Sequence, residues 1–164
     1  GQFSMNFVWD YFRRHFFQAP VGAGDNNSLG LINTQQIALT YISTPQTVWN
    51  LSLGHTFDKS PATNETTQSN NKYEATLSMS HQFNDKWSLN MSALKRKSYY
   101  NQFDTVETDT KRKDTTLGFK SSVTYMQSSS MMWDFMINNL DNNSNITRNV
   151  YMTQQASLSV TYLF

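Results

Sequence analysis

The chain has 164 residues, no cysteine, 15% charged residues and a formal net charge of +1. This near-neutral balance does not favour nucleic acid as a partner, because nucleic acid selects a basic face. No stretch approaches the ~20 apolar residues of a membrane helix, although the aromatic content of 14% is high for a mean hydropathy of −0.59. A helical membrane protein is therefore excluded, whereas membrane strands, which are only half apolar, are not.

Apolar and polar residues alternate from the start of the chain, where Phe3, Met5, Phe7, Trp9 and Tyr11 share one parity. A period of two indicates a β-strand with one face in an apolar medium and the other in a polar one. Seven further segments repeat this alternation and are expected to be strands: 29–41, 49–57, 73–83, 87–93, 117–125, 131–137 and 150–164. The sequence thus predicts eight strands of roughly ten residues each.

The connections between these segments alternate in length. Short turns are expected at 44–46, 84–86 and 127–130, and longer polar loops at 17–28, 58–71, 102–113 and 141–148. Short turns at one rim and long loops at the other are typical of membrane β-barrels. An even number of strands lets the last pair antiparallel with the first, and closure removes edges that hydrocarbon cannot hydrogen-bond. We predict one domain, residues 1–164, that is all-β: a closed antiparallel up-and-down transmembrane β-barrel of eight strands.

Aromatic residues are predicted to gather at both rims. One set lies where strands meet the short turns: Phe3, Tyr41, Trp49, Phe83, Trp87, Tyr125, Tyr162 and Phe164. A looser set lies towards the long loops: Tyr11, Phe57, Tyr73 and Tyr99. Two aromatic girdles are expected of a barrel that spans a membrane. A soluble β-sandwich would also show alternation, but it does not account for aromatic residues at both rims.

The last strand carries Leu158, Val160, Tyr162 and Phe164 at alternate positions. This ending resembles the last strand of bacterial outer-membrane β-barrel proteins. The resemblance implies the outer membrane of a Gram-negative bacterium, insertion by the barrel-assembly machinery, and both termini at the periplasmic rim. The closing hairpin, from Trp133 to Phe164, is also similar to that of larger barrels of the surface lipoprotein assembly modifier type.

The inward face is expected to be packed with polar side chains, because eight strands leave a lumen just wide enough for side chains. Its charged residues are Asp10, Glu74, Arg96, Lys120 and Asp134. A hairpin centred on Asp85 would place Glu74 directly opposite Arg96, where the two should form an ion pair. Lys120 is expected one diagonal step from Asp134. Loss of one partner from such a buried pair would cost about 3–5 kcal/mol.

Two further sets of residues have more than one interpretation. Lys95 and Lys97 share the parity of lipid-facing residues near the outer rim, where they would contact lipopolysaccharide phosphates unless the strand has already left the membrane. The first long loop contains an apolar cluster that would either cover the barrel mouth or dock a partner protein or lipid: Phe16, Phe17, Pro20 and Val21. Lys111-Arg112-Lys113 is expected in a solvated loop.

The sequence does not favour a catalytic role. Small outer-membrane enzymes such as lipid A deacylases and phospholipases use a Ser and a His on neighbouring strands. His55 and His81 have outward parity, whereas Ser52 and Ser78 face inward, so His15 is the one candidate. No catalytic, cofactor-binding or metal-binding residue is assigned, and no cofactor is expected.

Two classes of function stay open at this point. The first is a membrane anchor or surface-interaction protein that works through its extracellular loops and has a non-conducting interior. The second is a lipid-modifying enzyme, or a barrel component of a larger export or transport assembly. Outer-membrane lipid and lipopolysaccharide are the expected surroundings in either case.

Overall fold

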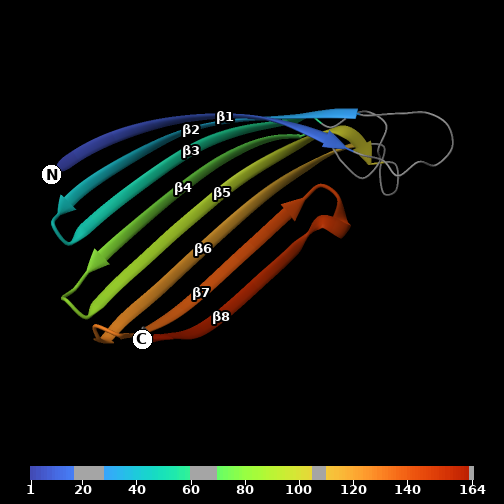
Figure 1. The fold of residues 1–164 in the computed structure, drawn as a ribbon. Coiled ribbons are helices and arrows are strands. Elements are labelled where there is room, and N and C mark those ends of the chain that lie inside the picture. Colours follow the sequence, from blue (N-terminus) through green and yellow to red (C-terminus); the bar gives the residue numbers. More distant parts are fainter. Residues whose placement is uncertain (17–27, 60–69, 105–109, 163–164) are drawn as a thin grey trace.

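The computed structural model describes residues 1–16, 28–59, 70–104 and 110–162, which form one curved sheet of eight strands (Figure 1). The strands are β1 (Gln2–Phe16), β2 (Ser28–Thr44), β3 (Thr47–Lys59), β4 (Asn70–Gln82), β5 (Trp87–Asp104), β6 (Thr110–Ser128), β7 (Met131–Ser144) and β8 (Tyr151–Tyr162). A short 3-10 helix, η1 (Thr147–Asn149), lies between β7 and β8. Each strand pairs antiparallel with its neighbours in chain order, so the predicted eight-stranded up-and-down fold is confirmed. No helix in these ranges is long and apolar enough to cross a membrane.

The alternation in the sequence produces two chemically different faces. The apolar face includes a row that runs in register across six strands: Met5, Leu39, Leu51, Leu77, Ala93 and Phe119. These side chains are not covered, since Met5 is 70% exposed and Leu77 is 47% exposed. Among the described residues, Ile146 is the only buried hydrophobic side chain. A sheet with so much open apolar surface and so little core is consistent with an outer-membrane protein, whose outer wall meets lipid.

Aromatic side chains lie at both ends of the apolar face. At the short-turn rim, the Trp87 and Tyr125 rings stack with their centroids 4.5 Å apart. Towards the long-loop rim, Tyr73 stacks on His55 at 4.7 Å and meets the edge of Tyr99 at 6.1 Å. This arrangement matches the aromatic girdles expected from the sequence.

The strands at the long-loop rim extend further than predicted. β5 continues to Asp104, β6 begins at Thr110 and β7 continues to Ser144, so the loops predicted at 102–113 and 141–148 are shorter in the structure. Lys111-Arg112-Lys113 therefore lies in β6, and its expected place in a solvated loop was wrong. Side-chain contacts across strands, described below, hold this extended part of the sheet.

β1 and β8 are the two edges of the sheet (Figure 1). Over the described ranges β1 is paired with β2 and β8 with β7, and no ladder joins β1 to β8. β1 begins and β8 ends at the rim that carries the short turns, which is the antiparallel arrangement that closure requires. Closure of the barrel stays a prediction.

Candidate functional site

The polar face of the sheet carries an ion pair between Glu74 and Arg96. β4 and β5 place these residues directly opposite each other, in the register expected for a hairpin centred on Asp85. The Arg96 Nε donates to Glu74 Oε2 at 2.7 Å, and a second guanidinium nitrogen lies 2.7 Å from the same oxygen. Both side chains are 40% exposed, so the pair is partly solvated rather than deeply buried.

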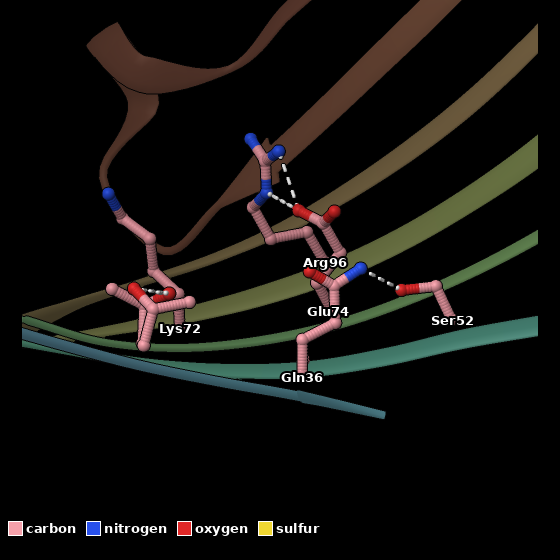
Figure 2. Close-up of a pocket in the computed structure, with 8 residues that line it drawn as sticks. Gln36, Ser52, Lys72, Glu74 and Arg96 are labelled. Atoms are coloured by element: carbon pink, nitrogen blue, oxygen red, sulfur yellow. Dashed lines mark hydrogen bonds and ion pairs between the residues drawn. The ribbon is translucent and has the colours of Figure 1, made fainter. Parts of the chain in front are cut away.

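A cavity of about 280 Å³ adjoins this pair and spans β2 to β5 (Figure 2). Its lining is entirely polar or small: Thr34, Gln36, Ser52, Gly54, Thr56, Lys72, Glu74 and Arg96. Within it Gln36 Nε2 donates to Ser52 Oγ at 2.7 Å, and the hydroxyls of Thr34 and Thr56 lie 3.3 Å apart. These bonds fix the positions of the side chains that form the cavity wall.

Gly54 keeps the cavity open. It lies in register between Gln36 on β2 and Glu74 on β4, so a larger residue here would place its side chain between theirs. A Cβ at this position would meet one neighbouring atom, the Gln35 carbonyl oxygen at 3.9 Å. The backbone therefore tolerates a side chain, and the effect of adding one would be to fill the cavity.

Lys72 supplies the uncompensated charge of the cavity. It lies opposite Thr56 on β3, and none of the ion pairs in the described part of the chain includes it. Figure 2 shows its side chain on the same face of the sheet as Glu74 and Arg96. The cavity thus offers one free ammonium group, a guanidinium that already has a carboxylate partner, and several hydroxyl and amide groups. This combination can hydrogen-bond a small molecule that carries a hydroxyl or an anionic group.

Cross-strand hydrogen bonds also form elsewhere on the polar face. Thr40 donates to Asn50 Oδ1 at 2.7 Å, and Ser80 donates to Asn90 Oδ1 at the same distance. Among the described residues, no cluster of three or more His, Asp or Glu side chains could hold a metal ion. The chemistry of this face is therefore hydrogen bonding by neutral groups with a few isolated charges.

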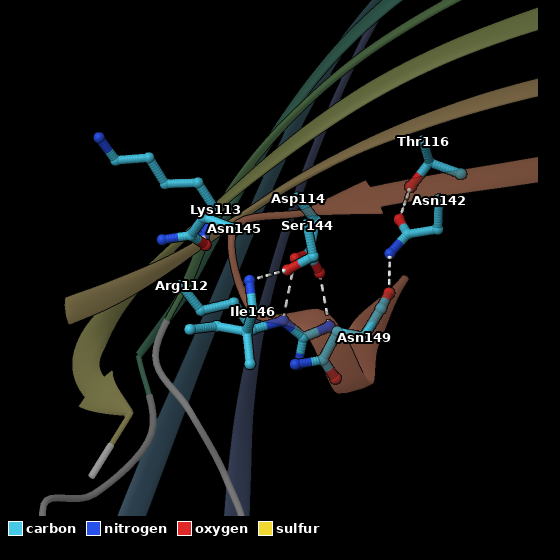
Figure 3. Close-up of polar contacts among 9 residues, drawn as sticks. All are labelled: Arg112, Lys113, Asp114, Thr116, Asn142, Ser144, Asn145, Ile146 and Asn149. Atoms are coloured by element: carbon cyan, nitrogen blue, oxygen red, sulfur yellow. Dashed lines mark hydrogen bonds and ion pairs between the residues drawn. The ribbon is translucent and has the colours of Figure 1, made fainter. Parts of the chain in front are cut away.

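A second polar cluster lies at the long-loop rim (Figure 3). Thr116 donates to Asn142 Oδ1 at 2.7 Å, and the Asn142 amide nitrogen donates to the Asn149 carbonyl at 2.7 Å. Ile146, which is fully buried, is held over this network, and its backbone N–H donates to Ser144 Oγ at 3.1 Å. The signal for this folded connection was the single Ile in a run of Asn and Ser, a segment that was expected to be a polar loop.

Asn145 links the same connection to β6. Its side-chain oxygen accepts from the Lys113 N–H at 2.6 Å, and its amide nitrogen donates to the Lys111 carbonyl at 3.0 Å. Next to it, Arg112 pairs with Asp114, with Nε to Oδ1 at 3.0 Å, and lies 4.4 Å above the centre of the Tyr100 ring. Burial raises the pKa of the Tyr100 phenol, an effect that the Arg112 charge opposes and Asp114 reinforces.

The other predicted interior charges are not brought together. Asp134 lies opposite Thr124, which donates to Asp134 Oδ1 at 2.8 Å. Lys120 lies opposite Asn138, two positions further along the same face, so the expected diagonal contact with Asp134 was wrong. The register of this hairpin also shifts between Met126 and Ser128, next to the turn.

The remaining predicted residues have clear places in the sheet. Asp10 lies opposite Thr34 on the polar face, and Lys95 and Lys97 lie on the apolar face of β5. Leu158, Val160 and Tyr162 of the predicted assembly signal are exposed on the apolar face of β8. Some predicted residues have side chains outside the part of the chain that the structure describes: His15, Phe164 and the loop cluster Phe16, Phe17, Pro20 and Val21.

The predicted separation of histidines from serines also holds. His55 lies opposite Tyr73 on the apolar face, and the Nδ1 of His81 lies 2.8 Å from the Thr47 hydroxyl. Ser52 and Ser78 occupy the polar face, on the other side of the sheet. None of these side chains forms a Ser–His pair suited to nucleophilic catalysis.

Comparison with known proteins identifies a family for the chain. No curated protein and no solved structure matches the chain. Residues 14–162, which cover nearly all of the sequence and seven complete strands, match a family of proteins. The chain belongs to the family described as "Putative MetA-pathway of phenol degradation".

Proposed function

We propose that the chain is an outer-membrane β-barrel that binds a small phenolic compound in the polar cavity of its interior. The observation that carries this proposal is the cavity between β2 and β5, with an open floor at Gly54 and a free ammonium group at Lys72. The family description, which refers to phenol degradation, supports the choice of ligand.

The membrane part of the proposal rests on the two faces of the sheet. The apolar face leaves large side chains open along every strand, and the aromatic girdles border it at both rims. In hydrocarbon, closure of β1 on β8 would satisfy the backbone groups of both edges. The termini then lie at the periplasmic rim, and the terminal residues Tyr162 and Phe164 serve as the signal for the barrel-assembly machinery.

The size and chemistry of the cavity suit a single-ring compound. An eight-stranded barrel has room for packed side chains or for one small ligand. The cavity, about 280 Å³, is just below the ~300–1,000 Å³ range of ligand pockets. A phenolic hydroxyl can donate to Glu74 or accept from Gln36 and Lys72, and a ring carboxylate or phenolate would neutralise Lys72.

Calorimetric titration of the detergent-solubilised protein with 4-hydroxybenzoate tests the proposal. We expect saturable binding that Gly54→Leu abolishes, because the leucine fills the space between Gln36 and Glu74. Lys72→Gln should weaken binding of 4-hydroxybenzoate about tenfold and change binding of uncharged phenol little, since only the anion gains from the cation. Ser121→Leu, a similar enlargement on the apolar face, is the control and should bind as the parent does.

Binding that survives Gly54→Leu, or no binding at all, would rule out the cavity as the site. Planar-bilayer recording adds an independent check, because a barrel with a filled interior should not conduct. Steady currents of porin size would contradict the proposed interior.

A second candidate is the anchoring or surface-interaction role. The ordered connection between β7 and β8 favours it, because Asn145 and Ile146 fix this segment before any partner arrives. A preorganised surface loses less conformational entropy on binding. The two roles are separable: a Gly54→Leu variant that loses phenolic binding should keep any interaction made through this rim.

A further inference from the structure

Two lysines lie on the apolar face, where no ion pair of the described residues includes them. Lys95 and Lys97 border a groove of about 380 Å³ that crosses β3, β4 and β5. We call it the β3–β5 groove, and its lining is Leu53, Gly54, Tyr73, Glu74, Ala75, Lys95 and Lys97. Most of its exposed wall is apolar, because Leu53 and Tyr73 are about half exposed.

No acidic group in the groove neutralises the two lysines. The one acidic residue of the lining, Glu74, directs its carboxylate to the polar face, where it binds Arg96 (Figure 2). The ion pairs of the described residues include neither Lys95 nor Lys97. On the apolar face the next acid in the Lys95 row is Asp141, on the far side of β6. The groove therefore carries two uncompensated positive charges.

The position of the lysines along β5 places them at a membrane interface. They lie eight and ten residues beyond Trp87, which is at the short-turn end of β5. At ~3.4 Å per residue and a tilt of ~40°, this corresponds to ~21 and ~26 Å along the membrane normal, against an apolar band of ~25 Å. The ammonium groups thus reach the headgroups while Leu53 and Ala75 beside them remain at acyl-chain depth.

Aromatic rings surround the same level. Tyr73 stacks on His55 and meets the edge of Tyr99, and both tyrosines are exposed on the apolar face. Tyrosine at this depth has its ring among acyl chains and its hydroxyl among headgroups. The groove thus combines an apolar floor, phenolic hydroxyls and two cations, which is the complement of a phosphorylated lipid.

We propose that the β3–β5 groove binds lipopolysaccharide, with Lys95 and Lys97 on a lipid A phosphate and an acyl chain along Leu53 and Ala75. The long-loop rim is then the outer-leaflet side, as the termini at the opposite rim require. This inference depends on the apolar face meeting lipid and does not depend on phenol binding in the interior.

Binding of purified lipid A to the full chain in detergent micelles tests the site, with three probes: bis-phosphorylated lipid A, dephosphorylated lipid A and phosphatidylglycerol. We expect saturable binding of the bis-phosphorylated form alone. Lys97→Gln should weaken it about fivefold and Lys95→Gln/Lys97→Gln about 30-fold, the factors expected for one and two cations at an anionic lipid surface. Lys95→Arg/Lys97→Arg should retain most of the affinity.

The control is Lys86→Gln, which removes one positive charge from the short turn at the opposite rim. It should bind lipid A as the parent does. Heat-modifiable migration on gels checks that each variant is folded before it is titrated. Equal binding of phosphatidylglycerol, or lipid A binding unchanged in the double glutamine variant, would overturn the proposal. Loss of lipid A binding with 4-hydroxybenzoate binding intact would support this site and leave the interior proposal standing.

Discussion

Glu74 and Arg96 form an ion pair on the polar face, and their exposure sets what the contact contributes to stability. A desolvated ion pair costs several kcal/mol when one partner is removed, whereas a solvated pair contributes about 0.2–1 kcal/mol. At 40% exposure each, the two side chains belong to the second class. The contact therefore orders the cavity wall more than it stabilises the sheet. The loss of about 3–5 kcal/mol expected from the sequence, which assumed a buried pair, is too large.

A double-mutant cycle on this pair measures that contribution. Glu74→Gln, Arg96→Gln and the combined variant should give a coupling free energy of about 0.5 kcal/mol in urea unfolding from detergent micelles. Ser78→Ala, on the same strand and face, is the control for loss of a polar group. A coupling of about 3 kcal/mol or more would show that the pair is desolvated when the sheet is folded in its membrane form.

The hairpins show how far an alternating sequence determines register. For β4 and β5 the prediction was correct, because Asp85 lies in a tight turn where Asn84 accepts hydrogen bonds from the N–H groups of Lys86 and Trp87 at 2.9 and 3.0 Å. For β6 and β7 the turn lies within the polar run from Gln127 to Ser130, which contains no Gly or Pro to fix its centre. A two-residue slip preserves the face of every side chain, so alternation cannot detect it.

The candidate site was predictable from the sequence only in part. Parity placed Glu74, Arg96 and Asp10 on one face, and the Asp85 turn set the first two opposite each other. The cavity itself was missed, because it depends on seven side chains from four strands and on the absence of a side chain at Gly54. Such sets come together only once every register in β2 to β5 is known.

The connection between β7 and β8 is anchored by Ile146, the only buried hydrophobic side chain among the described residues. Ile146→Ala should destabilise this connection by about 2 kcal/mol or more, as expected for a buried isoleucine. Hydrogen exchange at the Asn145 amide, which bonds the Lys113 carbonyl at 3.1 Å, should then accelerate about 30-fold. Val150→Ala, at a half-exposed position next to η1, is the matched control and should leave that amide protected. Unchanged exchange in Ile146→Ala would show that the hydrogen bonds alone hold this segment.

At the scale of the whole molecule, pairing of the two edge strands determines whether the polar face becomes an enclosed interior. Both edge strands present large apolar side chains: Met5 on β1 is 70% exposed, and Leu158 on β8 is 65% exposed. Their free N–H and C=O groups would each cost several kcal/mol in hydrocarbon. Pairing of β1 with β8 removes that cost, encloses the polar face and gives a lumen of the size that one small ligand requires.

Cysteine pairs test this closure directly, because the chain has no cysteine of its own. Each of three variants carries Asn6→Cys on β1 and one cysteine on the polar face of β8: Gln155→Cys, Ser157→Cys or Ser159→Cys. In a closed barrel we expect one of the three pairs to form an intramolecular disulfide, since Cα atoms of paired strands lie within the ~4.4–6.8 Å that a disulfide requires. The control pair Asn50→Cys/Ser78→Cys, which is in register on β3 and β4, should cross-link under the same conditions. Disulfide-linked dimers, or no β1–β8 product while the control pair reacts, would show that these edges do not pair with each other, and would remove the enclosed cavity on which phenolic binding depends.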